Sequence, residues 1–143
     1  MINKLSVTSV WVLDKDEALD FYVNKLGLEK GQDFKQGSYR WLTVRVPGDP
    51  GIDISLEQPG PPVQDEGTAA QLRELISKGA MGGLVFVTDD VRGLYETLKK
   101  RGVTDFTQVP TDNFYGTDMG IRDPFGNAIR ILQPKKAAQK VKA

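Results

Sequence analysis

The sequence predicts an α+β protein built from two tandem copies of one βαβββ module. Identical residues recur at one ungapped spacing of 75 positions, each copy has the same order of strand, helix and strands, and a segment rich in proline and glycine separates the copies. The chain of 143 residues has the length of one domain, which we expect to span 1–143. The recurring residues are Val10/Val85, Val12/Val87, Asp14/Asp89, Leu19/Leu94, Gly27/Gly102, Gly51/Gly126, Ile54/Ile129 and Gln58-Pro59/Gln133-Pro134.

The first module is expected over residues 4–59. It opens with a strand at 6–13, and aspartates at the start and Gly27 at the end predict a helix over 14–27. Apolar residues at helical spacing give this helix an inner stripe of Ala18, Phe21, Tyr22 and Leu26. The remaining strands are predicted near 33–35, at 39–46 and at 53–58.

The second module is expected over 80–134, after a linker and connecting helix at 60–79. Thr68 is predicted to cap the connecting helix, whose inner face would carry Ala69, Leu72, Leu75 and Ile76. Within the module the pattern predicts a helix over 89–102 and strands at 82–88, near 106–109, at 117–123 and at 127–133. Four lysines make residues 135–143 a basic tail.

Composition excludes several kinds of site. The chain has no cysteine, which excludes disulfides and thiolate chemistry, and no histidine, the commonest metal ligand. Its 19 basic and 19 acidic residues cancel, which argues against nucleic-acid binding. No stretch approaches the ~20 apolar residues of a membrane span, and the N-terminal residues lack the pattern of a signal peptide. We therefore expect a cytoplasmic protein that does not bind membranes.

Two segments carry a resemblance to a known family. "FYVNKLGL" at 21–28 and "RDPFGN" at 122–127 resemble the vicinal oxygen chelate superfamily, which includes glyoxalases, extradiol dioxygenases and bleomycin-resistance proteins. The resemblance extends over roughly residues 4–134. It implies two βαβββ modules whose curved mixed sheets form a cleft, usually in a homodimer.

The resemblance also implies where enzymes of the family hold a divalent metal. Their ligands come from the first and last strands of both modules, at positions occupied here by Val7, Ser55, Gly83 (or Gly82, one residue earlier) and Arg130. Valine and glycine offer no donor atom, and a guanidinium is always protonated and has no lone pair to give. We therefore expect no metal and no other cofactor.

Strand alternation places Arg130 on the face that the family directs toward the cleft. Arg130 is predicted either to anchor a ligand through forked hydrogen bonds or to form an ion pair with Asp53 or Glu57, and the sequence leaves both open. Tyr115 is the candidate for proton donation if the cleft performs chemistry. The full set of candidate ligand-binding residues is Ser9, Trp11, Trp41, Arg45, Asp53, Ser55, Glu57, Phe114, Tyr115 and Arg130.

Two functions follow from these expectations. The first is a metal-independent protein that binds a small molecule such as a drug or secondary metabolite, as the bleomycin-resistance members do, and so gives antibiotic resistance. The second is an enzyme of the lyase, isomerase or dioxygenase type, metal-free or with atypical ligands such as Asp53, Glu57 and Asp118. The fold alone does not choose between them, because one scaffold hosts many functions.

Overall fold

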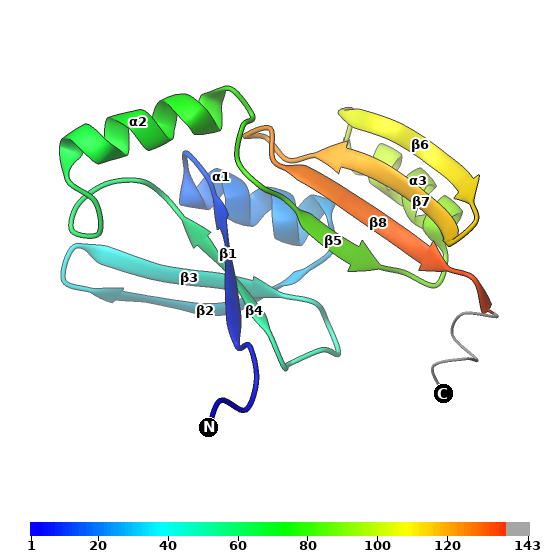
Figure 1. Cartoon of the computed structure of the whole chain (residues 1–143), viewed down its shortest axis with the longest axis horizontal. Coiled ribbons are helices and arrows are strands. Elements are labelled where there is room, and N and C mark those ends of the chain that lie inside the picture. The colour runs from blue at the N-terminus through cyan, green and yellow to red at the C-terminus, as the bar shows by residue number, and fades with distance from the viewer. Residues whose placement is uncertain (137–143) are drawn as a thin grey trace. The chain divides into compact units, whose positions relative to one another are not determined.

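The structure is a computed structural model that describes residues 1–136 (Figure 1). These residues form two compact units. Unit 1 contains residues 1–82 and 124–127, and unit 2 contains 83–123 and the residues from 128 onwards. Each unit holds one four-stranded mixed sheet, which confirms the α+β class and the two tandem modules. Most of the predicted basic tail, residues 137–143, lies outside the described residues. No helix in the described part of the chain is long and apolar enough to cross a bilayer.

The sheet of unit 1 has the strand order β1 (Val7–Trp11), β4 (Asp53–Glu57), β3 (Tyr39–Arg45) and β2 (Glu29–Gln36). β1 and β4 run parallel, and the other neighbours run antiparallel. The predicted inner stripe of the first helix is correct, because all four of its residues are buried, as are Val10, Val12, Leu42 and Leu56 from the sheet. One face of the sheet is therefore covered by the helix, and the opposite face carries the predicted polar and aromatic residues.

The helix of unit 1 has an irregular second half. The α-helix α1 spans Lys15–Leu19 and continues as a π-helical segment, η1, over Asp20–Lys25. At the end of η1 the amide of Leu26 donates to the carbonyl of Phe21, five residues earlier. The corresponding helix of unit 2, α3 (Val91–Lys100), is an ordinary α-helix.

This irregularity compensates for one extra residue in unit 1. The N-cap aspartates of the two helices, Asp14 and Asp90, are 76 positions apart. The positive-φ glycines that follow the helices, Gly27 and Gly102, are 75 positions apart. One more residue therefore lies between cap and glycine in unit 1, and a π-helical turn accommodates it without moving either end.

The extra residue corrects the predicted repeat. Thr8 pairs with Ile54 in unit 1, and Leu84 pairs with Ile129 in unit 2. Equivalent residues of the first strands are therefore 76 positions apart, whereas those of the last strands are 75 positions apart. The predicted equivalences Val10/Val85, Val12/Val87 and Asp14/Asp89 are therefore wrong by one residue. Burial agrees with the correction, because Val10 and Val12 are buried whereas Val85 and Val87 are exposed.

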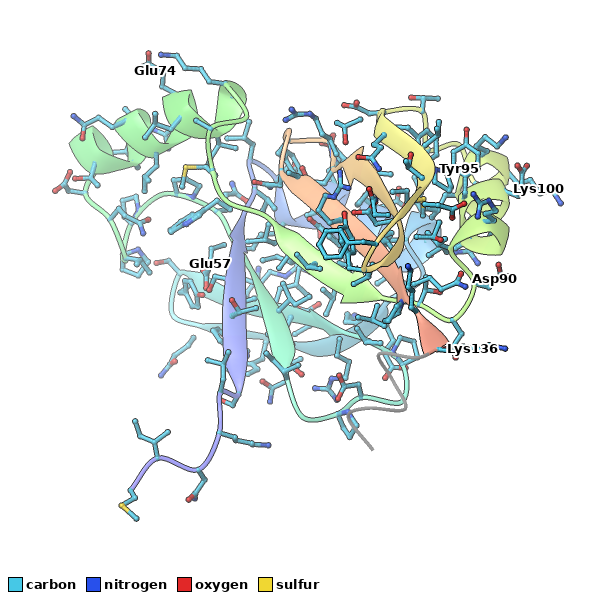
Figure 2. All side chains as sticks on the ribbon, turned by 45° about the vertical axis from the view of Figure 1, so that its right-hand side comes forward. Glu57, Glu74, Asp90, Tyr95, Lys100 and Lys136 are labelled. Carbon is cyan, nitrogen blue, oxygen red and sulfur yellow. The ribbon has the colours of Figure 1, made fainter. Side chains whose placement is uncertain are left out.

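Unit 2 repeats the topology with the strand order β5 (Leu84–Val87), β8 (Ala128–Pro134), β7 (Gly116–Arg122) and β6 (Phe106–Asn113). α3 contacts β6, β7 and β8, and its residues Val91 and Leu98 are fully buried. Figure 2 labels Asp90 before α3, and Tyr95 and Lys100 along it. β2 and β6 each have eight residues, so both strands are longer than the short segments that the sequence predicted.

The connecting helix α2 (Glu66–Ser77) begins before the predicted start. Its N-cap is Asp65 and not Thr68, because the Asp65 carboxylate accepts a hydrogen bond from the Thr68 amide at 2.8 Å. Ala69 and Ile76 are buried as predicted, but Leu75 is exposed, so the inner face of α2 is narrower than predicted.

Residues 124–127 of the "RDPFGN" segment form a turn that belongs to unit 1. Asn127 donates its side-chain amide to the carbonyl of Trp11 at 2.7 Å, and Gly126 has a φ of +81°. Such a φ favours glycine because it has no Cβ. The segment therefore forms a turn that holds the end of β1.

Candidate functional site

The face of the unit-1 sheet opposite the helix brings together most of the predicted candidates. Across the parallel pair β1–β4, Val7 lies beside Asp53, Ser9 beside Ser55 and Trp11 beside Glu57. From β3, Thr43 lies opposite Ser55. We call this the unit-1 face; it consists of Val7, Ser9, Trp11, Tyr39, Trp41, Thr43, Arg45, Asp53, Ser55 and Glu57.

At one end of the unit-1 face, Arg45 forms an ion pair with Asp53. Arg45 donates from Nε and Nη2 to the two oxygens of Asp53 at 3.0 and 2.9 Å, and the Thr43 hydroxyl donates to Asp53 at 2.6 Å. The hydrogen bonds from Arg45 are the main reason why the pKa of Asp53 lies below its ordinary value. Gly31 borders this cluster, and a Cβ at Gly31 would lie 2.7 Å from Asp53. Arg45 is therefore already paired within its own unit.

At the other end, Glu57 accepts hydrogen bonds from Tyr39 at 2.8 Å and from Ser55 at 2.6 Å. Burial and the bond to Glu57 raise the pKa of Tyr39 to about 12, so this phenol stays protonated at neutral pH. The indole of Trp41 donates to Gln32 at 2.8 Å. The polar groups of the unit-1 face thus bond mainly to one another.

The corresponding face of unit 2 is organised around Asp118 on β7. Arg130 on β8 donates from Nη2 to Asp118 at 2.6 Å and to Gln108 at 3.1 Å. Tyr115 donates to the same oxygen of Asp118 at 2.8 Å, and Gln108 and Asn113 donate to the other oxygen at 3.1 and 3.0 Å. Burial raises the pKa of Asp118, but the hydrogen bonds from Arg130 and Tyr115 outweigh it, so the net shift is downward.

Arg130 therefore lies on the predicted face, and its ion-pair partner is Asp118 on the neighbouring strand, instead of Asp53 or Glu57 as the sequence suggested. The bond from Tyr115 to Asp118 is also the main reason why the pKa of Tyr115 is raised. Its hydroxyl proton points to a carboxylate within the network. Gln108 and Asn113 were not predicted as site residues, and Asp118 was predicted only as an atypical metal ligand. The hydrogen bonds of the folded sheet bring all three into this network.

Apolar side chains surround this network. Val85 lies opposite Arg130 and Val87 opposite Leu132 on the edge strand β5, and the two valines are 71% and 66% exposed. Phe114, in the turn between β6 and β7, is 87% exposed and packs edge-to-face on Tyr115 at 5.2 Å. We call this the unit-2 face; it consists of Val85, Val87, Gln108, Phe114, Tyr115, Asp118, Gly120, Arg130 and Leu132.

The residues at the family's metal-ligand positions do not fit a metal. A Cβ at Gly83 would overlap the carbonyl oxygen of Ala128, so this position has no room for a side chain. Ser55 donates to Glu57, and the guanidinium of Arg130 carries a positive charge and has no lone pair. Within residues 1–136 no group of three or more histidine, cysteine or acidic side chains is placed to hold a metal ion. Asp53 and Glu57 accept hydrogen bonds within unit 1, and Asp118 accepts them within unit 2.

Unit 1 also contains a polar pocket of about 300 Å³ that the sequence did not predict. Lys15 crosses it: its amide donates to Gln58 at 3.2 Å, its ammonium donates to the carbonyl of Arg40, and the ammonium lies 4.5 Å from the centre of the Tyr39 ring. Burial lowers the pKa of Lys15, and Glu57 partly opposes that effect. The sequence contains no local signal for this pocket, because three separated segments form it.

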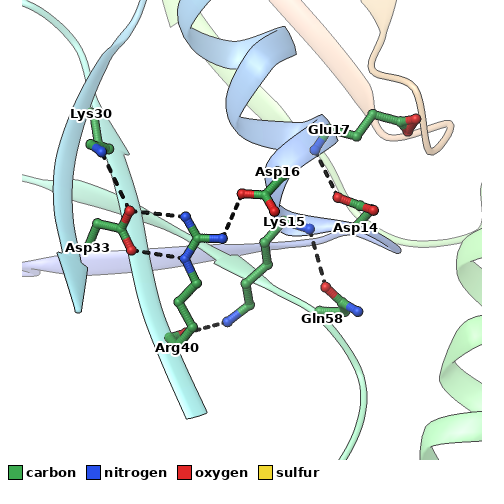
Figure 3. Close-up of polar contacts among 8 residues, drawn as sticks. All are labelled: Asp14, Lys15, Asp16, Glu17, Lys30, Asp33, Arg40 and Gln58. Atoms are coloured by element: carbon green, nitrogen blue, oxygen red, sulfur yellow. Dashed lines mark hydrogen bonds and ion pairs between the residues drawn. The ribbon is translucent and has the colours of Figure 1, made fainter. Parts of the chain in front are cut away.

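Arg40 stabilises the wall of this pocket. Its guanidinium donates to both oxygens of Asp33 at 2.9 and 3.0 Å and to Asp16 at 2.7 Å (Figure 3). The hydrogen bond from Arg40 lowers the pKa of Asp33 to about 2. Arg40 thus forms ion pairs with Asp33 and Asp16 within unit 1, which argues for a structural role of this cluster.

Comparisons with known proteins agree with the fold and extend it to a family. Residues 4–131 match the family described as the Glyoxalase/Bleomycin resistance protein/Dioxygenase superfamily. The protein YurT of Bacillus subtilis strain 168, whose function is uncharacterised, is 37% identical over 131 residues, which cover 91% of this chain and 98% of YurT.

Two solved structures are also similar. The crystal structure of UcmS2 has a TM-score of 0.86 and 40% identity, over 92% of this chain and 98% of that chain. TnmS3, an antibiotic binding protein from Streptomyces sp. CB03234, has a TM-score of 0.74 and 29% identity, over 94% of this chain and 98% of that chain. With the two βαβββ modules and the "RDPFGN" turn in place, the chain belongs to the glyoxalase/bleomycin resistance protein/dioxygenase superfamily.

Proposed function

We propose that this chain is a metal-independent small-molecule-binding protein whose ligand lies on the unit-2 face beside Arg130. One observation carries the proposal. At the position where the family resemblance implies a glutamate ligand, the chain has Arg130, which forms an ion pair with Asp118 at 2.6 Å. An arginine that is fixed in this way supplies hydrogen-bond donors in place of a metal.

The surroundings of Arg130 support a binding role. Val85, Val87 and Phe114 are largely exposed around a polar centre, and clusters of exposed apolar side chains beside a few fixed polar groups are typical of small-molecule sites. The unit-1 face has fewer polar groups available to a ligand, because Asp53 and Ser55 are buried and bonded to neighbouring residues. For the unit-1 face by itself we propose Ser9, Trp11 and Trp41 as residues that contact a ligand, with Arg45, Asp53, Ser55 and Glu57 supporting them.

The class of ligand is proposed from similarity. TnmS3 is an antibiotic binding protein and is 29% identical to this chain over 94% of its length. We therefore propose an antibiotic or related secondary metabolite as the ligand. We also propose a twofold homodimer, because a second copy would cover apolar surface that one subunit exposes.

A thermal-shift screen of antibiotics and secondary metabolites tests the proposal. A ligand present at 100 times its Kd stabilises the native state by about 2.7 kcal/mol, which is readily detected. The hits should be unaffected by EDTA, be recovered unchanged after incubation, and lose affinity in the variant Arg130→Met. The matched control is Arg92→Met, because Arg92 pairs with Asp112 at 3.5 Å at the exposed surface of the same unit.

Elemental analysis of the purified protein supplies the second arm. We expect far less than one zinc, iron, manganese or nickel ion per chain, because the donor atoms that those ions require are missing from the family positions. About one tightly held ion per chain, or chemical conversion of a ligand found in the screen, would overturn metal-independent binding in favour of an enzyme.

A further inference from the structure

We infer that the ligand of the unit-2 face is uncharged where it meets Arg130 and is held there through an acceptor such as a carbonyl oxygen. This inference rests on the proposed function and specifies the chemical class of the ligand. It follows from how the charge and the hydrogen-bonding capacity of Arg130 and Asp118 are distributed.

The carboxylate of Asp118 has no remaining capacity for a ligand. A carboxylate has about four lone-pair sites on its two oxygens. In this structure Gln108 and Asn113 donate to Oδ1, and Tyr115 and Arg130 donate to Oδ2. The side chain of Asp118 is only 8% exposed. A cationic ligand would therefore find the negative charge neutralised and its acceptor sites occupied.

An anionic ligand is disfavoured for the complementary reason. Arg130 is the cation of the face, and its Nη2 atom lies 2.6 Å from Asp118. An anion that bonded to Arg130 would lie close to a carboxylate that is largely shielded from water, and like charges at such a distance repel strongly. The ion pair thus gives this part of the face no net charge.

Arg130 still has donors for a neutral acceptor. The hydrogen bonds from Arg130 to Asp118 and to Gln108 both leave from Nη2, and its side chain is 38% exposed. The Nε and Nη1 hydrogens are therefore not used by those bonds. The guanidinium lies over Gly120 on β7, where a Cβ would be 2.7 Å from Nη1, and the exposed Val85 lies opposite Arg130 on β5, so a planar molecule would meet these donors beside an apolar side chain.

Two fluorescent probes test the inference on the whole protein. Nile red is an uncharged aromatic molecule with a carbonyl group, and 1-anilinonaphthalene-8-sulfonate is an aromatic anion. We expect the wild-type protein to bind Nile red at least about tenfold more tightly than the sulfonate at 0.15 M salt. Binding to the unit-2 face is checked with Val85→Ser and Phe114→Ala, each of which should weaken Nile red binding.

The variant Asp118→Asn removes the matching charge and keeps the shape. We expect the ratio of the affinity for the sulfonate to the affinity for Nile red to rise about tenfold, because this ratio reports the change of charge even where the variant alters the binding of both probes. The control is Asp112→Asn, because Asp112 is a largely exposed aspartate on β6 that pairs only weakly with Arg92. If Asp118→Asn does not fold, the wild-type preference between the two probes still decides, because it depends on no variant.

The outcomes separate the two levels of the proposal. If neither probe binds, or if binding is unchanged by Val85→Ser and Phe114→Ala, the proposed binding face is overturned. The inferred uncharged ligand is overturned if both probes bind the face and the sulfonate binds as tightly as Nile red. It is also overturned if Arg130→Met, as a single substitution, weakens binding of the sulfonate but not of Nile red. In both cases the binding function stands.

Discussion

The Nη2 atom of Arg130 lies 2.6 Å from an oxygen of Asp118, and the two residues come from neighbouring strands of the unit-2 sheet. The family resemblance implies a carboxylate at the position of Arg130, where it would bind a metal. Here the carboxylate is on the next strand, and an arginine occupies the position. The charges of the pair cancel, so this position presents hydrogen-bond donors without a net charge.

Replacing Arg130 by methionine should destabilise the protein. The change leaves Asp118 with a buried negative charge and without its cation, although Tyr115, Gln108 and Asn113 still donate to it. Breaking a fully buried pair costs about 3–5 kcal/mol, and partial exposure of Arg130 reduces this to about 1–2 kcal/mol. Urea denaturation at pH 7 measures the loss. A loss no larger than the ~0.5 kcal/mol expected for the surface control Arg92→Met would contradict the pair in solution.

A side chain at Gly120 should displace Arg130. The Cβ of alanine at this position would lie 2.7 Å from Nη1 of Arg130 and would overlap the hydroxyl of Thr107. We expect Gly120→Ala to lower the unfolding free energy by about 1–3 kcal/mol and to weaken ligand binding. Gly82→Ala is the matched control, because a Cβ there meets no atom within 4 Å. Equal stability of the two variants would show that the guanidinium does not lie over Gly120.

The Arg40–Asp33 pair should contribute to stability against acid. The hydrogen bond from Arg40 lowers the pKa of Asp33 to about 2 in the folded protein, against 3.8 for the ordinary side chain. Because the folded pKa is depressed, the contribution is fully present above about pH 4 and disappears as the pH falls through about 2. Asp33→Asn should therefore cost about 1 kcal/mol at pH 6 and almost nothing at pH 2. Denaturation across this range, with Asp49→Asn as an exposed control, measures the difference; a pH-independent cost would refute it.

The proposed homodimer predicts a mass in solution of twice the 15.8 kDa of the chain. Phe34 on the edge strand β2 and Val109 on the edge strand β6 are exposed outside the proposed ligand site, and such apolar surface is typically covered by a partner. Light scattering at micromolar concentration measures the mass. The single-chain mass under these conditions would rule out the dimer.

The sequence by itself determined the two βαβββ modules and the faces of the last strand in each. Local rules suffice for this. Alternation along a strand assigns Ser55 to one side of β4 and Arg130 to one side of β8. Gly27 and Gly102 end their helices because both adopt positive φ. The lack of metal donors at Val7 and Gly83 was equally a matter of residue type. Each of these features depends on a few residues that are adjacent along the chain.

Only the tertiary structure decided which of these residues bond to one another. A single extra residue, accommodated by the π-helical segment, moves β1 by one position relative to the predicted repeat. A comparison of the two modules at one ungapped spacing does not detect this shift. The partner of Arg130 depends on how β8 is aligned with β7, and that alignment places Asp118 beside it. Strand register is fixed by the packing of a whole sheet, because a slip of one residue would turn every side chain to the opposite face.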